Sequence, residues 1–299
     1  MELRDIEYFT VVAEHGHLGR AAESLRLSQP ALSKSLRRLE RILDAKLVKR
    51  TPRGIELTPE GATLLARTRE LRSSLQNVTR EIADLGRGKV GEVRVGTGPM
   101  LAEQLFPASF LAVLEDAPRT RFTIVVSDND GMIPALRRGE LDLIVNYPPR
   151  TMSKEGLIEE LLCEDEFVVV ASSRHRLAKL RRVTIGDLAQ ERWVLSEPSL
   201  LAQQRLRQIF QECGFSPPQV ALETRSVQLK LETVAASNLL DYTSRRVVAK
   251  LAQRYTVKIL PIKALTWRRP VSLIYREGAY LSPAVRRFSE SLRMTAQRL

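Results

Sequence analysis

Cations and short polar side chains recur on one face of a predicted helix that begins at Gln29. Ser33 and Arg37 follow Gln29 at intervals of four residues. Lys34 lies four residues after Pro30. Residues at these intervals share one face of an α-helix. Arg and Gln can make paired hydrogen bonds to base edges in the DNA major groove, and Lys and Ser can reach base edges or phosphates. The chemistry that this face favours is recognition of double-stranded DNA.

The apolar residues of the same segment determine which face points outward. Leucines recur at helical spacing opposite the polar face, namely Leu32, Leu36, Leu39 and Leu43. We expect them to pack inward, which leaves the polar face in solvent. Ser28 can cap this helix, and Gln29 and Pro30 stand in its first turn, where backbone N–H groups have no helical partner to lose.

Two further helices are predicted before this one. The range 18–25 has an apolar stripe of Leu18, Ala21, Ala22 and Leu25. Its alanines allow another helix to cross closely. Arg26 and Leu27 then form a tight turn. The range 5–14 is the first helix, and the residues on its apolar face are Leu3, Ile6, Phe9, Thr10 and Ala13. Together the three helices can enclose a small core.

Positive charge is concentrated in this region. From Arg20 to Arg53 the chain has ten Lys and Arg against three acidic residues. Such a density is expected of a surface that neutralises phosphates. Two short strands, 47–50 and 55–57, are predicted to form a hairpin with Arg53 at its tip. The alternative is an ordinary solvated helix face, which a basic run usually is. The neighbouring turn, hairpin and charge favour DNA recognition.

The order and spacing of these motifs resemble the LysR-type transcriptional regulators. The shared residues are Arg20-Ala21-Ala22 to Leu25, Leu27-Ser28-Gln29-Pro30-Ala31-Leu32-Ser33, Leu39-Glu40, Leu47, Arg50-Thr51 and Leu57-Thr58-Pro59-Glu60-Gly61. The resemblance implies a winged helix-turn-helix whose second helix, the recognition helix, enters the major groove while the wing touches the backbone or minor groove. The DNA-binding residues that follow from the face and the resemblance are Arg20, Ser28, Gln29, Pro30, Ser33, Lys34, Arg37 and Arg53.

The chain departs from the family pattern at three places in this region. Ala45 stands for the usual Gly after the recognition helix, and Val48 for the usual Phe on the first wing strand. Gly16-His17-Leu18 replaces a more typical Gly-Ser-Phe. None of these departures removes a base-reading side chain.

A long helix is predicted from Pro59 to about Leu85, capped by Thr58 and ended by Gly86-Arg87-Gly88. Its inward positions alternate by four and three residues and are Leu64, Thr68, Leu71, Leu75, Val78, Ile82 and Leu85. A seam of this kind favours pairing with another helix. The alternative is packing on the C-terminal domain of the same chain. The resemblance favours a dimerising linker helix, with a seam made by Leu64, Leu71, Leu75, Val78 and Ile82. A dimer supplies the two recognition helices that a two-fold operator needs.

From Glu92 onward, predicted strands and helices alternate, which indicates an α/β domain with mostly parallel sheets. The run Gly139-Glu140-Leu141-Asp142-Leu143-Ile144-Val145 resembles the effector domain of the same family, which shares its fold with periplasmic solute-binding proteins. The fold class is therefore α+β multidomain. Its predicted parts are a winged helix-turn-helix (1–58), a linker helix (59–88) and a two-lobed effector domain (89–299). Lobe I is expected at 91–161 and 267–299, and lobe II at 162–266.

The resemblance implies a small molecule in the cleft between the lobes. In such sheets, ligands bind at the carboxyl ends of strands, where helix N-termini present free N–H groups to an anion. The candidate effector contacts are Thr97, Gly98, Pro99, Met100, Ser127, Asn129, Asn146, Tyr147, Ser196, Leu201, Thr224 and Asn238. Each could instead be an ordinary loop or cap residue. The run 238–244 replaces a Gly-x-Gly run that the family often has, so we expect a more polar wall in lobe II.

Composition is consistent with an intracellular DNA-binding protein. The 299 residues carry a formal net charge of +12, and their number predicts two or more domains. Basicity is general along the chain, so only its clustering around the helix-turn-helix is diagnostic. The chain has no apolar N-terminal run typical of a signal peptide and no segment long enough to span a bilayer, so we expect a cytoplasmic protein without membrane contact. Cys163 and Cys213 are too few for a disulfide framework.

Catalytic, metal and redox chemistry are disfavoured. Gly96-Thr97-Gly98 is followed by Leu101 where a dinucleotide motif needs Gly. The run His15-Gly16-His17 is expected to be a solvated turn rather than a metal site. Redox sensing is the alternative for Cys163 and Cys213, but acidic neighbours and a helix C-terminus raise a thiol pKa, so packing is expected. We predict no enzymatic activity, cofactor or metal.

The sequence thus predicts a sequence-specific transcriptional regulator of LysR type, in which an effector in the interlobe cleft alters how the oligomer sits on DNA. The predicted partners are double-stranded DNA, a small-molecule effector, a second copy in a dimer or tetramer, and RNA polymerase. By the resemblance, the effector is a carboxylate. A solute-binding protein and an α/β enzyme are the competing classes. The DNA-reading segment and the lack of an export signal disfavour the first, and the missing catalytic motifs disfavour the second.

Overall fold

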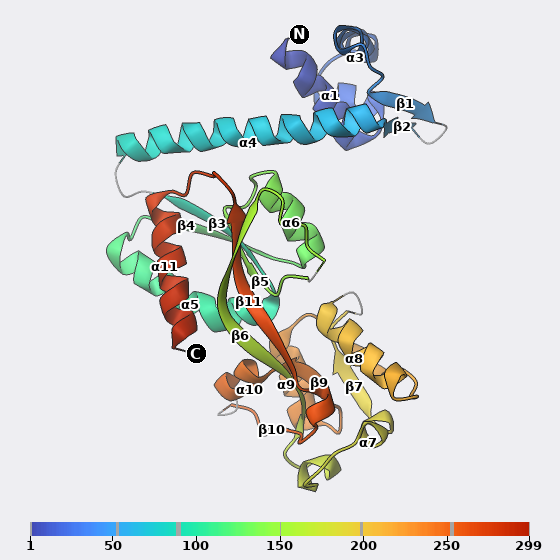
Figure 1. Cartoon of the computed structure of the whole chain (residues 1–299), viewed down its shortest axis with the longest axis vertical. Helices are drawn as coiled ribbons and strands as arrows, with labels where there is room; N and C mark the ends of the chain where they lie inside the picture. Colours follow the sequence, from blue (N-terminus) through green and yellow to red (C-terminus); the bar gives the residue numbers. More distant parts are fainter. Residues whose placement is uncertain are drawn as a thin grey trace. The chain divides into compact units, whose positions relative to one another are not determined.

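The computed structural model describes residues 2–51, 54–87, 91–149, 151–197, 200–251 and 254–298. The chain forms two compact units, Met1–Thr79 and Arg80–Leu299. Most of their elements are labelled in Figure 1. The long helix α4 begins in the first unit and ends in the second.

The first unit is a helix-turn-helix followed by a hairpin. Its elements are α1 (Leu3–His15), α2 (Leu18–Ser24), α3 (Gln29–Leu43), β1 (Val48–Thr51), β2 (Gly54–Leu57) and α4 (Pro59–Arg87). Phe9, Leu32 and Leu39 are fully buried where the first three helices meet, and Leu65 of α4 joins the same core. The leucine spacing therefore predicted the inward face of α3 correctly as far as Leu39. Leu43, which was expected to pack inward, is 38% exposed because it stands in the last turn of α3, beyond the residues that α1 and α2 cover.

The turn after α3 has its left-handed residue at Asp44 (φ 47°, ψ 38°), one position before Ala45. Ala45, which stands for the usual Gly, has no positive φ. Glu40 fixes the following segment, because its side chain accepts hydrogen bonds from the Leu47 N–H (3.0 Å) and from Lys46 Nζ (3.1 Å).

The start of α4 explains the Thr58-Pro59-Glu60-Gly61 motif. Thr58 Oγ1 accepts a hydrogen bond from the Gly61 N–H at 3.0 Å and donates one to the Lys46 carbonyl. A Cβ atom at residue 61 would lie 1.9 Å from the Leu47 carbonyl oxygen, so this close approach requires glycine. The motif therefore fixes α4 to the segment that leads into the hairpin.

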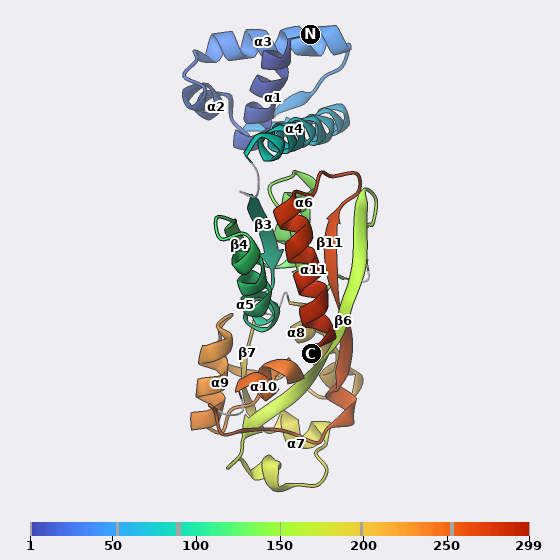
Figure 2. The ribbon, with the colours of Figure 1, turned by 90° about the vertical axis from the view of Figure 1, so that its left-hand side faces the viewer.

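The second unit has two lobes. Lobe I contains β3 (Glu92–Thr97), α5 (Pro99–Asp116), β4 (Arg121–Val126), α6 (Asn129–Arg137), β5 (Leu143–Asn146) and α11 (Pro283–Gln297). Lobe II contains η1 (Arg176–Lys179), α7 (Ile185–Ala189), β7 (Arg192–Leu195), α8 (Leu201–Glu212), β8 (Gln219–Glu223), α9 (Val227–Ala236), β9 (Asp241–Ser244), α10 (Arg245–Leu251), β10 (Val257–Ile259) and η2 (Lys263–Leu265). Two long strands, β6 (Leu157–Ser172) and β11 (Trp267–Arg276), run through both lobes, as Figure 2 shows.

The main sheet is mixed, whereas mostly parallel sheets were predicted. Its strand order is β10-β6-β11-β5-β3-β4, with β9 also paired to β6. β3 is parallel to β4 and β5, but every pair that includes β6 or β11 is antiparallel. Of these long strands, only the apolar runs 167–171 and 271–275 have a local sequence pattern typical of a strand. The first half of β6 escaped prediction because glutamates such as Glu159 and Glu160 are uncommon in strands.

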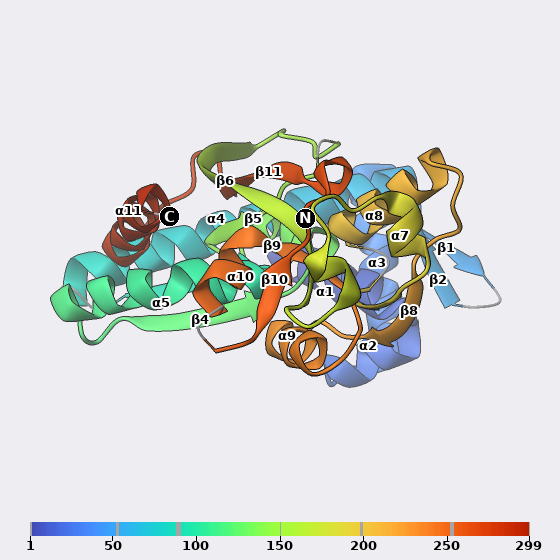
Figure 3. The same ribbon diagram turned by 90° about the horizontal axis from the view of Figure 1, so that it is seen from below.

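Helices cover both faces of the lobe I sheet. Leu143 and Val145 of β5 belong to the core beneath α5 and α11, while Ile144 points to the opposite face, under α6. The helices α5 and α11 lie side by side (Figure 3). Between them the rings of Phe106 and Phe288 stack with centroids 5.6 Å apart. Among the described residues no helix is long and apolar enough to cross a membrane.

Candidate functional site

The outer face of α3 exposes the side chains that were predicted to read DNA. Gln29, Pro30, Lys34 and Arg37 are exposed and Ser33 is half-buried, while Leu32 and Leu36 on the opposite side are buried. Arg20 is exposed on α2. Ser28 is exposed and caps α3, since its Oγ accepts a hydrogen bond from the Ala31 N–H at 3.4 Å. The outward face of α3 is thus polar and cationic, and the opposite face, toward the core, is apolar.

A buried acid that the sequence analysis did not single out links α1 to the recognition helix α3. Asp5 is only 1% exposed, and its Oδ1 accepts a hydrogen bond from Ser35 Oγ at 2.6 Å. Arg38 Nε donates to Asp5 Oδ2 at 3.1 Å. The hydrogen bond from Arg38 is the main cause that lowers the Asp5 pKa, against the opposing effect of burial. Ser35 and Arg38 neighbour the residues of the polar face, so Asp5 fixes the helix that carries it. The signal in the sequence was an acid in the first turn of an apolar helix.

The hairpin is fixed to the turn between α1 and α2. The Ile55 N–H donates to the Gly16 carbonyl oxygen at 2.8 Å. Gly54 has φ 131°, and a Cβ atom there would lie 2.4 Å from the same oxygen, so glycine is required at this contact. Arg53, the predicted cation at the tip, lies outside the described residues, and its role stays a prediction.

The predicted seam of α4 divides into two parts. Leu64 is half-buried and packs against the core of the first unit. Leu71, Leu75, Val78 and Ile82 are 49% to 65% exposed. The side chain of Leu85 is outside the described part of the chain. The exposed part is a row of apolar side chains on a helix surface, which normally signals a missing partner.

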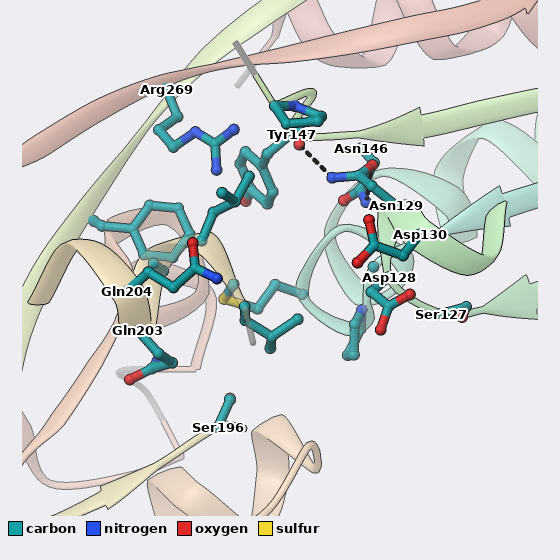
Figure 4. A pocket seen from close by; sticks show the side chains of 18 of the residues that line it. Ser127, Asp128, Asn129, Asp130, Asn146, Tyr147, Ser196, Gln203, Gln204 and Arg269 are labelled. Carbon is teal, nitrogen blue, oxygen red and sulfur yellow. Dashed lines mark hydrogen bonds between the residues drawn. The ribbon is translucent and has the colours of Figure 1, made fainter. Parts of the chain in front are cut away.

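A cavity of about 290 Å³ lies between the two lobes (Figure 4). Nine of the twelve predicted effector contacts line it, namely Gly98, Pro99, Met100, Ser127, Asn129, Asn146, Tyr147, Ser196 and Leu201. Its wall also contains residues that sequence reasoning missed, namely Asp128, Asp130, Pro149, Thr151, Phe167, Leu200, Ala202, Gln203, Gln204, Lys230, Tyr242 and Arg269. Thr97, Thr224 and Asn238 are not part of this wall. Thr97 is fully buried in β3, Thr224 Oγ1 accepts the Ser226 N–H, and the exposed Asn238 holds His175 through its carbonyl oxygen.

The lobe I wall is prearranged by hydrogen bonds between its amides. Asn146 Nδ2 donates to Asn129 Oδ1 at 2.9 Å, and Asn129 Nδ2 donates to the Tyr147 carbonyl oxygen at 2.9 Å (Figure 4). These bonds hold the first turn of α6 against the end of β5.

An arginine from β11 forms another part of the wall. The Arg269 guanidinium lies 4.8 Å from the Trp267 ring centroid and 5.5 Å from that of Tyr147, and its Nη2 donates to the Pro148 carbonyl oxygen at 2.7 Å. Tyr147 donates its hydroxyl to Asp165 Oδ2 at 2.7 Å. Burial, followed by the charge of Asp165, raises the Tyr147 pKa well above its ordinary value. This phenol is therefore a neutral, fixed part of the site.

Two helix N-termini face the cavity without a side-chain cap. Gly98 precedes α5 and Leu200 precedes α8, and neither supplies a capping hydrogen bond. Residues of both first turns line the cavity. The free N–H groups and the positive end of the helix dipole favour an anion there. The third helix start at the cavity, that of α6, is capped, since Asp128 Oδ1 accepts the Gly131 N–H at 3.0 Å.

One arginine joins the lobes beside the cavity. Arg225 Nη2 of lobe II contacts Asp128 Oδ2 of lobe I at 3.4 Å and also pairs with Glu197 of its own lobe. The hydrogen bond from Arg225 is the main cause that lowers the Glu197 pKa. These side chains are one third or more exposed, apart from Asp128 at 32%, so solvent screens the pairs.

Metal and thiol chemistry find little support in the described ranges. They contain no group of three or more His, Cys, Asp or Glu placed to hold a metal ion. His17 instead caps α2 by accepting the Gly19 N–H. Cys163 packs against the main core, and burial raises its pKa, which disfavours a reactive thiolate. Cys213 is exposed, so the expectation that both thiols pack inside was wrong for it; it stands at the end of α8, where the chain turns outward.

A winged helix-turn-helix with an outward cationic face, followed by a two-lobed α/β domain with an interlobe cavity, defines a class of ligand-responsive DNA-binding regulator. Comparison with known families agrees. Residues 3–62 match the bacterial regulatory helix-turn-helix domain of the lysR family, and residues 86–297 match the LysR substrate binding domain. The chain belongs to the LysR family of transcriptional regulators, and it is a regulator rather than an enzyme.

Relatives along the full chain carry regulator names. The chain is 28% identical to the HTH-type transcriptional regulator GbpR of Azospirillum brasilense, over 98% of this chain and 86% of that protein. It is 28% identical to the transcriptional dual regulator GltC of Bacillus subtilis, over 97% and 96%. Identity to the dual regulator OxyR of Escherichia coli is 25%, over 98% and 95%.

Solved structures share the fold. The LysR family regulator CbnR aligns with a TM-score of 0.61 at 21% identity, over 99% of both chains. CbnR complexed with its target DNA gives the same TM-score and identity, over 99% of this chain and 100% of that one. A full-length variant of OxyR from Pseudomonas aeruginosa aligns at 0.59 and 22%, over 99% of both. The predicted fold class, including the winged helix-turn-helix and the two-lobed domain, is thereby confirmed.

Proposed function

We propose that this regulator reads its operator with the polar face of α3, and that a small carboxylate in the interlobe cavity changes how its oligomer sits on DNA. The observation that carries the proposal is the pairing of two features in one chain. One is an exposed cationic face on a helix with a fixed apolar backing. The other is a cavity on which uncapped helix N-termini converge from both lobes.

The DNA contacts divide by chemistry. Gln29 and Arg37 are the candidates for base edges, since their side chains form paired hydrogen bonds with adenine and guanine respectively. Ser28, Ser33, Lys34 and Arg20 can reach phosphates as well as base edges. Arg53 is proposed as a phosphate contact in the wing. Residues 1–58 are accordingly the DNA-binding part, and 89–299 the effector-binding part.

Residues 59–88 are proposed to pair with the same helix of a second copy. The support is the exposed apolar row of Leu71, Leu75, Val78 and Ile82 on α4. A second exposed apolar patch on lobe I supports contacts between effector domains: Ile124, Val125 and Val126 of the edge strand β4 and Leu111 of α5 are 41% to 63% exposed. One such contact is enough for a dimer, and a second joins dimers into a tetramer. RNA polymerase in the cytoplasm is the proposed further partner of the DNA-bound oligomer.

The test measures ligand binding first and then the effect of the ligand on the DNA footprint. Organic acids and other metabolites are screened for a rise in the melting temperature of the full chain, since a ligand that binds only the folded state stabilises it. The protein is then footprinted on the DNA upstream of its own gene and neighbouring genes, with and without the acid that binds. We expect a protected two-fold site whose footprint changes with the acid. An unchanged footprint at saturating acid would contradict the coupling between the two units.

A further inference from the structure

The interlobe cavity contains a buried cation on its lobe II side. Lys230 of α9 lines the cavity and is only 2% exposed. Its Nζ donates to Asp241 Oδ1 at 3.1 Å, and Asp241 is fully buried. An ammonium has three donors, and Asp241 is the one partner that Lys230 has among the described residues. Charged groups are rarely buried unless they are fully paired, so the remaining donors call for an acceptor.

A second donor on the same wall also lacks an acceptor. Tyr242 follows Asp241 in β9, lines the cavity and is 1% exposed. Its hydroxyl makes no hydrogen bond within the described part of the chain. Burial raises the Tyr242 pKa, so the hydroxyl stays protonated and can donate. A buried hydroxyl without an acceptor is destabilising, and an acceptor on a ligand would recover that loss.

The lobe I helix α5 begins close to this cation. Met100, in the first turn of α5, packs against the apolar cluster that Val227 and Leu231 of α9 form with Val247. Thr243 Oγ1 contacts Met100 Sδ at 3.5 Å. Asp241 and Thr243 are two residues apart in β9, so their side chains point to the same face of the strand. On this face Asp241 pairs with Lys230 and Thr243 contacts Met100. Lys230 and the first turn of α5 therefore both line the cavity, and Asp241, Thr243 and Met100 connect them.

We propose that Lys230 is a ligand-binding residue that, with the N-terminus of α5, holds the carboxylate of the effector between the two lobes. The inference rests on the proposed function and adds to it the charged contact that selects an anion. Tyr242 supplies a further hydrogen bond from the same wall. An anion in this place has donors from both lobes, so its binding favours the arrangement in which they are close.

Substitution of Asp241 is the control, because it breaks the same ion pair as substitution of Lys230 but should not weaken acid binding. Lys230→Met and Asp241→Asn both break the same buried ion pair, and both are expected to lower the melting temperature. If the pair were merely structural, the two variants would affect ligand binding alike. If Lys230 binds the anion, Lys230→Met removes the cation, whereas Asp241→Asn removes a competing carboxylate and leaves the cation.

The experiment measures binding of simple acids by the full-length protein. The probes are sodium salts of aliphatic, hydroxylated and aromatic acids, from acetate to benzoate and succinate. Each acid is compared with its neutral amide, and inorganic phosphate is tested as a further anion. Thermal shift finds the acid that binds, and calorimetry gives its Kd. We expect wild-type protein to bind an acid and not its amide. Lys230→Met should weaken that acid by at least about tenfold, and Asp241→Asn should bind it as tightly as wild type or more tightly.

The outcomes separate this inference from the proposed function. Equal binding of the acid by wild type and Lys230→Met overturns the role of Lys230 but leaves a carboxylate effector in the cavity. Equal binding of acid and amide likewise removes charge recognition and keeps the cavity as the site. Binding of phosphate alone, or of no probe, overturns both the carboxylate and the role of Lys230. If Lys230→Met does not fold, we replace it with the double variant Lys230→Met/Asp241→Asn, because the double variant buries no unpaired charge. Acid binding by the folded double variant would refute the proposal.

Discussion

Arg37 projects from the exposed face of α3, four residues after Ser33 and eight after Gln29. Its neighbours on the inner side, Leu36 and Leu39, are buried, so truncating the arginine leaves the packing of α3 untouched. The proposed role of Arg37 in DNA recognition can therefore be tested without disturbing the core.

We predict that Arg37→Ala costs about 1 to 3 kcal/mol on the specific operator and much less on random DNA. Fluorescence anisotropy on both DNAs measures the difference. Arg181→Ala, which removes an exposed arginine from lobe II, is the matched control and should change neither affinity. Equal weakening on both DNAs would show that Arg37 contacts phosphate only.

Asp5 acts on the same helix from inside. Its carboxylate is buried and receives hydrogen bonds from Ser35 and Arg38, so a neutral amide would leave donors of α3 badly paired. We predict that Asp5→Asn lowers the free energy of unfolding by about 1 to 3 kcal/mol. The Asp5 pKa is lowered in the folded state, so its contribution is present above the ordinary carboxyl pKa near 4 and is lost as the pH falls below it.

The measurement is the melting temperature of wild type and Asp5→Asn from neutral pH to about pH 3. The gap between them should close on acidification. Asp130→Asn, which changes an exposed acid of α6, controls for the loss of one negative charge. A gap that is constant with pH would mean that the ionised carboxylate is not what stabilises α3.

The turn after α3 shows how an element's end is set by one residue. Asp44 holds a left-handed conformation that glycine adopts without steric cost, and Ala45 does not have a positive φ. We predict that Asp44→Gly stabilises the protein by up to about 1 kcal/mol, whereas Ala45→Gly destabilises it by a similar amount. Chemical denaturation of the two variants gives the comparison. The same sign for both would contradict the assignment of the left-handed position to Asp44.

The seam on α4 leaves a row of apolar side chains uncovered, namely Leu71, Leu75, Val78 and Ile82. Leu75 is 57% exposed, so Leu75→Asp costs the single chain little, but in a symmetric dimer it would bury a carboxylate on each copy. We predict that Leu75→Asp dissociates the oligomer and weakens operator binding without touching a DNA contact. Sedimentation velocity detects this, with Ala66→Asp as a control at an exposed position on the opposite side of the same helix. A Leu75→Asp protein that sediments like wild type would refute the seam.

Elements with a regular apolar period were predictable, and elements that depend on distant partners were not. The leucines of α3 predicted its start at Gln29 and its inward face as far as Leu39. The acidic half of β6 is a strand because β11 pairs with it along its length, which no local pattern reveals. The cavity shows the same division. Gly98 and Asn146 were found at strand ends, whereas Lys230 and Arg269 come from distant segments of the chain. A lysine in the apolar stretch 227–236 was the available signal.

At the scale of the whole molecule, the proposed coupling between ligand and DNA has to follow from binding energies. An effector changes the regulator only if it binds two arrangements with different affinities, and DNA must then change the affinity for the effector by the same factor. The lobes provide a place for such a difference. Arg225 connects Asp128 of lobe I to Glu197 of lobe II beside the cavity, so a ligand that alters the lobe spacing also alters this connection.

We predict that Ser196→Trp uncouples the two functions. Ser196 lines the cavity and is half-buried, so an indole there can fill the ligand's place without entering the core. Thr97, although predicted as a contact, is fully buried, so a bulky group at that position would disturb β3 instead. The Ser196→Trp protein should bind operator with wild-type affinity and show no change of footprint when the acid that stabilises wild type is added. Ser173→Trp, exposed and away from the cavity, should respond normally. A footprint of Ser196→Trp that still changes with the acid would place the effector elsewhere on the molecule. In that case operator DNA should also shift the calorimetric Kd of the acid equally in wild type and in Ser196→Trp, because the effects of the two ligands on each other's affinity are equal.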